Sequence, residues 1–282
     1  DEWRTISDFS RSAALSRVCR RLWAVLQRRH LRCHADSASA AGLMAHLHGD
    51  AAVHTLHLTC PDMDAKAACE LSTLSSAPAL TTLALRLSHA EIVHPREHLL
   101  TLQNVALPHV FVFPSFSAAS ACISFLRALT LNLGASSVEG AGMQALAALK
   151  DAPSLTTLTL ELSAKKVGDA GAEALAALRD APALRTLALT LWYNHIGDYG
   201  AKALAALKAA PALESLVLDL SANTIGAAGA EALAELEEAP RLTALSLTLW
   251  YNHVGDIGAA ALAALKGSPS LKALTLDLSV NA

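Results

Sequence analysis

The sequence predicts an α/β solenoid in which short parallel strands form one sheet and helices form an outer layer. Three observations support this fold class. One frame recurs at a constant spacing along the chain of 282 residues, each unit alternates leucine with other residues, and each then changes to an alanine-rich stretch of helical spacing. The leucine that opens the frame recurs at Leu126, Leu155, Leu184, Leu213, Leu242 and Leu271.

The first element of each unit is predicted to be a strand. After Leu184, the leucines at 187, 189 and 191 alternate with other residues, which is the period of a strand with one buried face. An asparagine follows each strand, at Asn194, Asn223, Asn252 and Asn281. Because this residue is small, polar and expected to be buried, we expect it to hydrogen-bond backbone groups of the adjacent turn.

The second element is predicted to be a short helix. Asp198, which follows Gly197, can cap its start, and Pro211 ends it and returns the chain to the next strand. An apolar stripe along about three turns is formed by Ala201, Leu204, Ala205 and Leu207. One strand and one helix cannot bury both of their faces alone, so the units must stack side by side.

The unit resembles the leucine-rich repeat family, whose LxLxxNxI signature is matched by Leu189, Leu191, Asn194 and Ile196. The 29-residue unit with a helical second half resembles the ribonuclease-inhibitor-like subclass, which implies a curved solenoid with strands lining a concave face. The resemblance covers roughly residues 51–282 and is most specific from 126 onward. It implies seven units and the first strand of an eighth, so we expect the chain to end within a repeat.

The spacing of the repeats predicts an insertion near residues 103–125. The interval from Leu80 to Leu126 is longer than the interval between any two successive later frame leucines, such as Leu126 and Leu155. The apolar stretch 105–125 is about long enough to span a bilayer, but Pro108 and Pro114 interrupt it, so we expect a partly buried insertion and no membrane partner. A loop insertion and a translated intron both remain open.

Residues 1–50 are predicted to form a helical head. Residues 1–34 hold eight arginines and three acidic residues, a local charge of +5, and residues 12–33 have the pattern of an amphipathic helix. This segment resembles the second half of an F-box, a helix that docks a ubiquitin-ligase adaptor. The resemblance implies docking through Leu15, Val18, Cys19, Leu22 and Trp23. A simple cap on the solenoid is the alternative. No nucleic-acid partner is expected, because clustered cations are present without a reading element.

The cysteine and histidine pattern predicts neither disulfides nor a metal site. Five cysteines, an odd number without CxxC spacing, indicate reduced thiols in an intracellular protein, cytoplasmic or nuclear. Neither close group of metal-ligating residue types matches a zinc spacing; the groups are His30, Cys33 and His34, and His54, His57 and Cys60. We expect no cofactor.

No nucleotide-binding or hydrolase motif is present, so the sequence predicts a protein without enzymatic activity. The resemblance implies a protein–protein interaction module, and with the F-box-like head it implies the substrate receptor of an SCF-type ubiquitin ligase. A scaffold or sensor without a ligase role is one alternative. A GTPase activator of the Ran-activator type is another, by analogy at the level of the family alone.

A second period, twice as long as the first, predicts a binding surface on the concave face. LTLWYNHIGD at 189–198 returns as LTLWYNHVGD at 247–256, whereas the unit between them lacks the aromatic residues. Because side chains alternate along a strand, the positions between the leucines face away from the helices. The candidate binding residues are Glu161, Thr190, Trp192, Tyr193, Asp219, Thr248, Trp250, Tyr251 and Asp277. Two exposed tryptophans flanked by carboxylates favour a basic protein partner. The alternative is that the tryptophans shield strand ends and that the longer period is the length of a duplicated two-unit segment.

Overall fold

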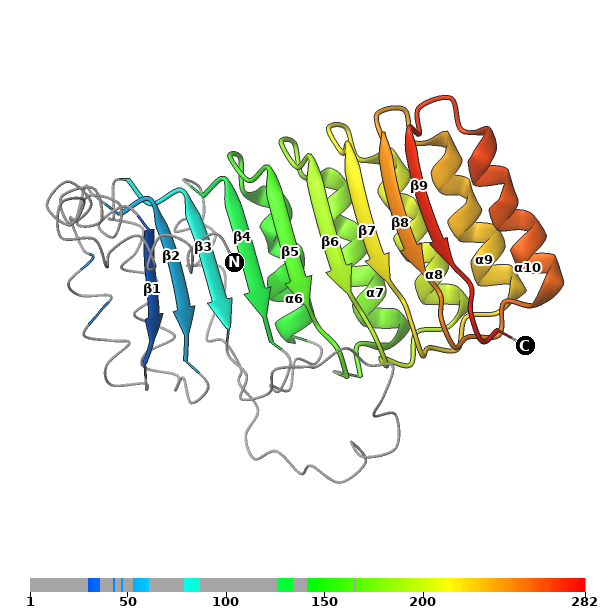
Figure 1. Ribbon diagram of the computed structural model, residues 1–282, viewed down its shortest axis with the longest axis horizontal. Coiled ribbons are helices and arrows are strands. Elements are labelled where there is room, and N and C mark those ends of the chain that lie inside the picture. Colours follow the sequence, from blue (N-terminus) through cyan, green and yellow to red (C-terminus); the bar gives the residue numbers. More distant parts are fainter. Residues whose placement is uncertain are drawn as a thin grey trace, which may run out of the picture.

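A computed structural model describes residues 30–35, 43, 47, 53–60, 79–86, 126–133, 141–164 and 166–281. Its strands form one parallel sheet in which each strand lies beside the next in sequence, from β1 to β9 (Figure 1). The strands are β1 (His30–His34), β2 (Thr55–Thr59), β3 (Thr82–Arg86), β4 (Ala128–Asn132), β5 (Thr157–Glu161), β6 (Thr186–Thr190), β7 (Ser215–Asp219), β8 (Ala244–Thr248) and β9 (Ala273–Asp277). The predicted α/β solenoid is confirmed.

Helices cover one side of this sheet (Figure 1). The helices are α6 (Ala141–Ala147), α7 (Gly168–Ala176), α8 (Asp198–Ala205), α9 (Ala227–Ala234) and α10 (Gly255–Leu262). Each continues into a tighter 3₁₀ turn: η3 (Ala148–Asp151), η4 (Ala177–Asp180), η5 (Ala206–Ala209), η6 (Glu235–Glu238) and η7 (Ala263–Gly267). Neighbouring helices pack closely, since a Cβ atom added at Gly229 would lie 3.1 Å from that of Ala201. Glycine and alanine at the contacts allow this approach.

Rows of leucine form the core between the two layers. The register pairs Leu158 with Leu187, Leu187 with Leu216, and Leu216 with Leu245. All four are at most 2% exposed. Burial of one such side chain contributes about 1.5–3 kcal/mol, so a regular leucine spacing is enough to hold neighbouring units in register.

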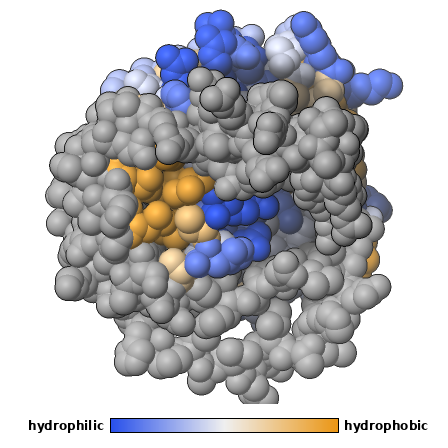
Figure 2. Space-filling view, turned by 60° about the vertical axis from the view of Figure 1, so that its left-hand side comes forward, coloured by the Kyte–Doolittle hydropathy of each residue, from blue (hydrophilic) through white to orange (hydrophobic). Residues whose placement is uncertain are grey.

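The first strand lies inside the range that was assigned to the helical head. The prediction of a helix through Cys33 is wrong for residues 30–33, which belong to β1 and pair with β2. Leu31 and Cys33 pack against the core while His30, Arg32 and His34, which alternate with them, are exposed, which is a strand period of two. Figure 2 looks at this end of the sheet and shows apolar side chains gathered together, next to hydrophilic ones.

Other expectations fall outside the described residues. They are the insertion near 103–125 and the adaptor-docking residues of the head. Among the helices that the structure describes, none is long and apolar enough to cross a bilayer.

The asparagines after the strands connect successive repeats, as expected. Asn223 Oδ1 accepts hydrogen bonds from the backbone N–H groups of Asn194 (3.0 Å) and Ile196 (2.9 Å) in the preceding repeat. Its Nδ2 donates to the carbonyl oxygens of Leu191 and Leu220, both at 2.9 Å. One buried amide thereby satisfies backbone groups of two repeats, which would otherwise be buried without partners.

The aspartate at the start of a helix also acts between repeats. Asp198 was expected to cap its own helix, but its Oδ1 accepts from the backbone N–H groups of Gly226 (2.7 Å) and Gly229 (2.9 Å) at the start of α9. Asp169 does the same for Gly197 and Gly200 of α8, at 2.7 and 2.9 Å. The first N–H groups of a helix have no partner within it, and the stacked carboxylate of the preceding repeat lies close enough to accept from them.

Candidate functional site

The strand residues that alternate with the buried leucines form a surface on the side of the sheet away from the helices. This surface, here called the open face, is the concave face of the sequence analysis. The register places one residue of each strand in a single row: His34, Thr59, Arg86, Asn132, Glu161, Thr190, Asp219, Thr248 and Asp277. The acidic and threonine candidates therefore lie side by side on successive strands.

The acidic residues of this row are held by hydrogen bonds. Asp219 Oδ1 accepts from the backbone N–H (3.0 Å) and the hydroxyl (2.5 Å) of Ser221. Asp277 has the same arrangement with Ser279, at 2.9 and 2.5 Å. Glu161 accepts from the side-chain amide of Asn132. Each of the two aspartates in the row is thus paired with the serine two positions later in its own repeat.

The sequence predicts two exposed tryptophans, but neither of them is exposed. Trp192 is only 5% exposed, and Trp250 is half-buried. Backbone hydrogen bonds from Tyr193 to Ser221 and from Ala222 to Trp250 continue the ladder beyond the strands, so serine lies beside each tryptophan. A large ring beside small neighbours can pack flat over them, whereas rings on adjacent strands would compete for the same space. Trp192 is therefore a packing residue.

The tyrosines that follow the tryptophans are exposed instead. Tyr193 is 40% and Tyr251 49% exposed, and each ring lies 5.6 Å from its neighbouring tryptophan ring at an interplanar angle of 37°. His195 lies 5.6 Å from Tyr193 between ring centroids. His195 and His253 are also exposed, so we call Tyr193, His195, Tyr251 and His253 the aromatic ridge.

The backbone of the ridge is held in an uncommon conformation. Tyr193, His195 and Tyr251 have φ angles of 54°, 57° and 54°, in the left-handed region. This conformation costs a non-glycine residue roughly 1–2 kcal/mol. Ala164, Ala222 and Val280 adopt it at the position equivalent to the two tyrosines, so the turn itself imposes it there. At the position of His195, Thr224 and His253 do not adopt it. The sequence places both tyrosines among the binding candidates but does not predict the left-handed turn that exposes them.

Tryptophan burial leaves one polar atom unsatisfied. The indole Nε1 of Trp192 is buried without a hydrogen-bond acceptor in the described part of the molecule. Leaving such a donor unpaired costs about 1–3 kcal/mol. The packing of the buried ring must therefore offset this cost.

The opposite end of the open face carries two arginines and three histidines in the described ranges. His30, Arg32, His34 and Arg86 are exposed, and His57 is half-buried. Burial lowers the pKa of His57, and the positive charges of Arg32 and His30 lower it further. Sequence reasoning considered some of these residues only as metal ligands and missed the charged surface.

The metal-ligand candidates do not converge. Cys33 packs against the core while its neighbours on β1 are exposed, and burial raises the pKa of its thiol. Cys60 is fully buried, whereas His57 belongs to the open face. Within the described ranges, no group of three potential ligands comes together.

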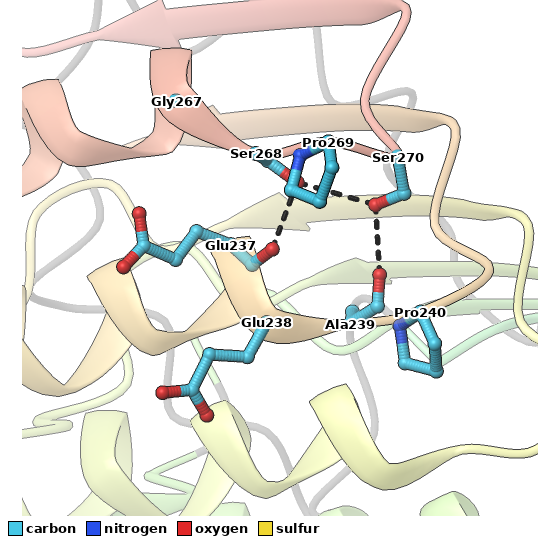
Figure 3. A pocket seen from close by; sticks show the side chains of 8 residues that line it. All are labelled: Glu237, Glu238, Ala239, Pro240, Gly267, Ser268, Pro269 and Ser270. Carbon is cyan, nitrogen blue, oxygen red and sulfur yellow. Dashed lines mark hydrogen bonds between the residues drawn. The ribbon is translucent and has the colours of Figure 1, made fainter.

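A shallow groove of about 490 Å³ lies between the last two helical units, away from the open face. Figure 3 shows Glu237, Glu238 and Ser268 among its lining residues. The Ser268 and Ser270 hydroxyls donate to the carbonyl oxygens of Glu237 and Ala239, both at 2.8 Å. These bonds join the last two repeats, so the groove is a seam between units.

Comparison with known proteins agrees with this geometry. A leucine-rich repeat family model matches residues 184–205 and 215–234, which span β6 to α9. A comparison with curated proteins found no match. Stacked units, leucine rows and asparagine turns give the described part of the chain the architecture of a leucine-rich repeat solenoid, in agreement with the two matched repeats.

Proposed function

We propose that this protein is a non-catalytic protein–protein interaction module whose open face binds a basic segment of a partner. The observation that carries the proposal is the row of carboxylates beside the aromatic ridge. Glu161, Asp219 and Asp277 lie on alternate strands of one face. Tyr193 and Tyr251 follow the strands on either side of Asp219. The rings come three residues after Thr190 and Thr248, which flank Asp219 in the row, so a basic segment that lies over Asp219 and continues past the strand ends would meet them.

The typical free energies of these contacts indicate how each of them contributes to binding. An exposed ion pair is worth only about 0.2–1 kcal/mol. A cation over an aromatic ring adds about 0.5–1 kcal/mol at an exposed site, and tyrosine is among the residues that dominate interfaces. We expect the tyrosines to supply most of the affinity and the carboxylates to select a basic partner. The family match supports the broader role, because leucine-rich repeats generally bind proteins.

A capture experiment tests the basic-partner proposal. The protein and a Tyr193→Ala/Tyr251→Ala/Asp219→Asn variant are immobilised, and captured proteins are compared quantitatively by mass spectrometry. Replacing the tyrosines is preferable to replacing Trp192, because Trp192 is buried and its loss would disturb the fold. Glu231→Gln, an exposed carboxylate change on α9, is the matched control. Recovery of the same partners by the triple variant would refute the proposal.

The narrower role is that of a substrate receptor in an SCF-type ubiquitin ligase, with a partner on the open face and the adaptor on the head. It is supported by the F-box-like pattern of Leu15, Val18, Cys19, Leu22 and Trp23. Co-purification with the ligase adaptor, lost on Leu15→Asp/Leu22→Asp, is the expected result. Failure of the intact chain to bind the adaptor would leave a scaffold or sensor role. The odd number of cysteines supports an intracellular location.

A further inference from the structure

The open face has opposite charges at its two ends. On β1, the exposed residues His30, Arg32 and His34 alternate with buried ones, and Arg86 on β3 is exposed. The described open-face positions of β1 to β4 include no aspartate or glutamate. The acidic residues begin at Glu161 on β5.

The cations lie close enough to act together. The register places Arg32 beside His57 and Thr59 beside Arg86. Adjacent strands are about 4.8 Å apart, so β1 and β3 are separated by about 10 Å. The pKa of His57 is lowered first by burial and then by the neighbouring charges of Arg32 and His30. An anionic side chain placed here would meet the exposed guanidinium groups of Arg32 and Arg86.

We propose that β1 to β3 form a second subsite that binds acidic side chains. The open face then accepts one extended partner segment that is acidic at one end and basic at the other. The contact with the basic end of the segment rests on the proposed function. The subsite on β1 to β3, here called the cationic subsite, is argued from its own residues.

The floor between the two ends suits an extended chain. Ala84, Ala128 and Thr130 are small, half-buried residues on the open face of β3 and β4. From His57 on β2 to Asp219 on β7 there are five strand spacings, about 24 Å. An extended segment covers about 3.3 Å per residue, so about seven residues separate the two charged ends.

An acidic peptide fits this surface better than a nucleic acid. A polyanion that continued along the face would meet Glu161 only two strands beyond Arg86. The described open-face positions of β1 to β3 also carry no phenylalanine, tyrosine or tryptophan on which a base could stack. A short acidic segment meets neither obstacle.

Fluorescence anisotropy with labelled peptides and the full chain tests the subsite. The bipolar peptide carries three aspartates, a seven-residue Gly/Ser spacer and three arginines. One control replaces the aspartates by serine, another replaces the arginines by serine, and a third shortens the spacer to two residues. We expect the bipolar peptide to bind at least about tenfold more tightly than either single-charge peptide, because the second contact becomes intramolecular. The short-spacer peptide should lose this gain.

Variants that remove charged side chains show which residues cause the tighter binding of the bipolar peptide. Arg32→Ser/Arg86→Ser should remove the advantage of the bipolar peptide and leave the basic peptide's affinity unchanged. Asp219→Asn/Asp277→Asn should weaken the basic peptide instead. Lys202→Ser/Lys266→Ser, which removes two exposed charges from the helical layer, is the matched control and should have no effect.

The outcomes separate the two proposals. If the basic peptide binds and the aspartates do not increase its affinity, the cationic subsite is refuted and the proposed function stands. If only the acidic peptide binds, and loses affinity in the arginine variant, the subsite stands and the basic partner is refuted. No binding by either peptide refutes both. A twelve-residue oligothymidylate that binds more tightly than the acidic peptide would overturn the assignment in favour of nucleic acid.

Discussion

Asp198 caps the helix of the next repeat through the backbone N–H of Gly226, 2.7 Å from its carboxylate. Gly226 has a φ angle of −99° there, and Gly197, which receives Asp169, has −105°. Where the preceding repeat has no aspartate at this position, the φ angle of the glycine is different. Ala227 takes the place of the aspartate before Gly255, and Gly255 has a φ angle of 60°. In these three repeats, a glycine that receives the aspartate cap has a negative φ angle, and the glycine without the cap has a positive one.

A carboxylate at position 227 should stabilise the last helix. Ala227→Asp places an acceptor where Asp198 lies in the preceding repeat, within reach of the N–H groups of Gly255 and Gly258. We expect the free energy of unfolding to rise by about 0.5–1 kcal/mol, measured by urea denaturation. Ala228→Asp adds the same charge at an exposed neighbouring position and is the control. An equal effect of both variants would show that general electrostatics, and not the cap, is responsible.

The two glycines should respond differently to alanine. Gly255→Ala forces a side chain into the left-handed region and should lower the free energy of unfolding by about 1–2 kcal/mol. Gly226→Ala should cost less, because its φ angle is ordinary and an added Cβ atom would lie 3.4 Å from the Asp198 carboxylate. Thermal unfolding of both variants provides the comparison. A larger loss for Gly226→Ala would contradict it.

Trp192 should tolerate phenylalanine but not alanine. Trp192→Phe loses some packing and removes the unsatisfied indole N–H, so we expect unfolding free energy to change by less than about 1 kcal/mol. Trp192→Ala should cost about 3–5 kcal/mol by leaving a cavity. Trp250→Ala is the control and should cost less, since Trp250 is half-buried. Chemical denaturation measures all three, and a large loss for Trp192→Phe would mean that the indole N–H has a partner.

The ionisation of His57 should depend on Arg32. Burial, Arg32 and His30 lower the pKa of His57 from its ordinary value of 6.5. The unfolded chain therefore takes up this proton at a higher pH than the folded protein does. The contribution to stability is present above about pH 6.5 and is lost as the pH falls through the lowered pKa.

Arg32→Ser should raise the pKa of His57 toward its ordinary value, and Lys202→Ser should leave it unchanged. NMR titration of the imidazole resonances measures both. A pKa of His57 at or above 6.5 in the unmodified protein would contradict the lowered value.

Inter-repeat contacts explain why the candidate site was only partly predictable. The row from Glu161 to Asp277 followed from the strand period, because alternate residues on aligned strands must share a face. The burial of Trp192 and the left-handed turn at Tyr193 did not follow, because small serine neighbours in the adjacent repeats and the stacking of the turns decide them. The cationic subsite was missed because β1 had been read as the end of a helix.

The sequence by itself determined the repeating unit: its strand, its asparagine turn, its short helix and the leucine rows that stack them. These depend on local periodicity and on apolar burial, both of which recur in every unit. Tertiary structure alone decided which helix Asp198 caps, which aromatic rings reach solvent and how charge is distributed along the open face. Each of these depends on contacts between residues of different repeats, which lie far apart in the chain and meet only after the units have stacked.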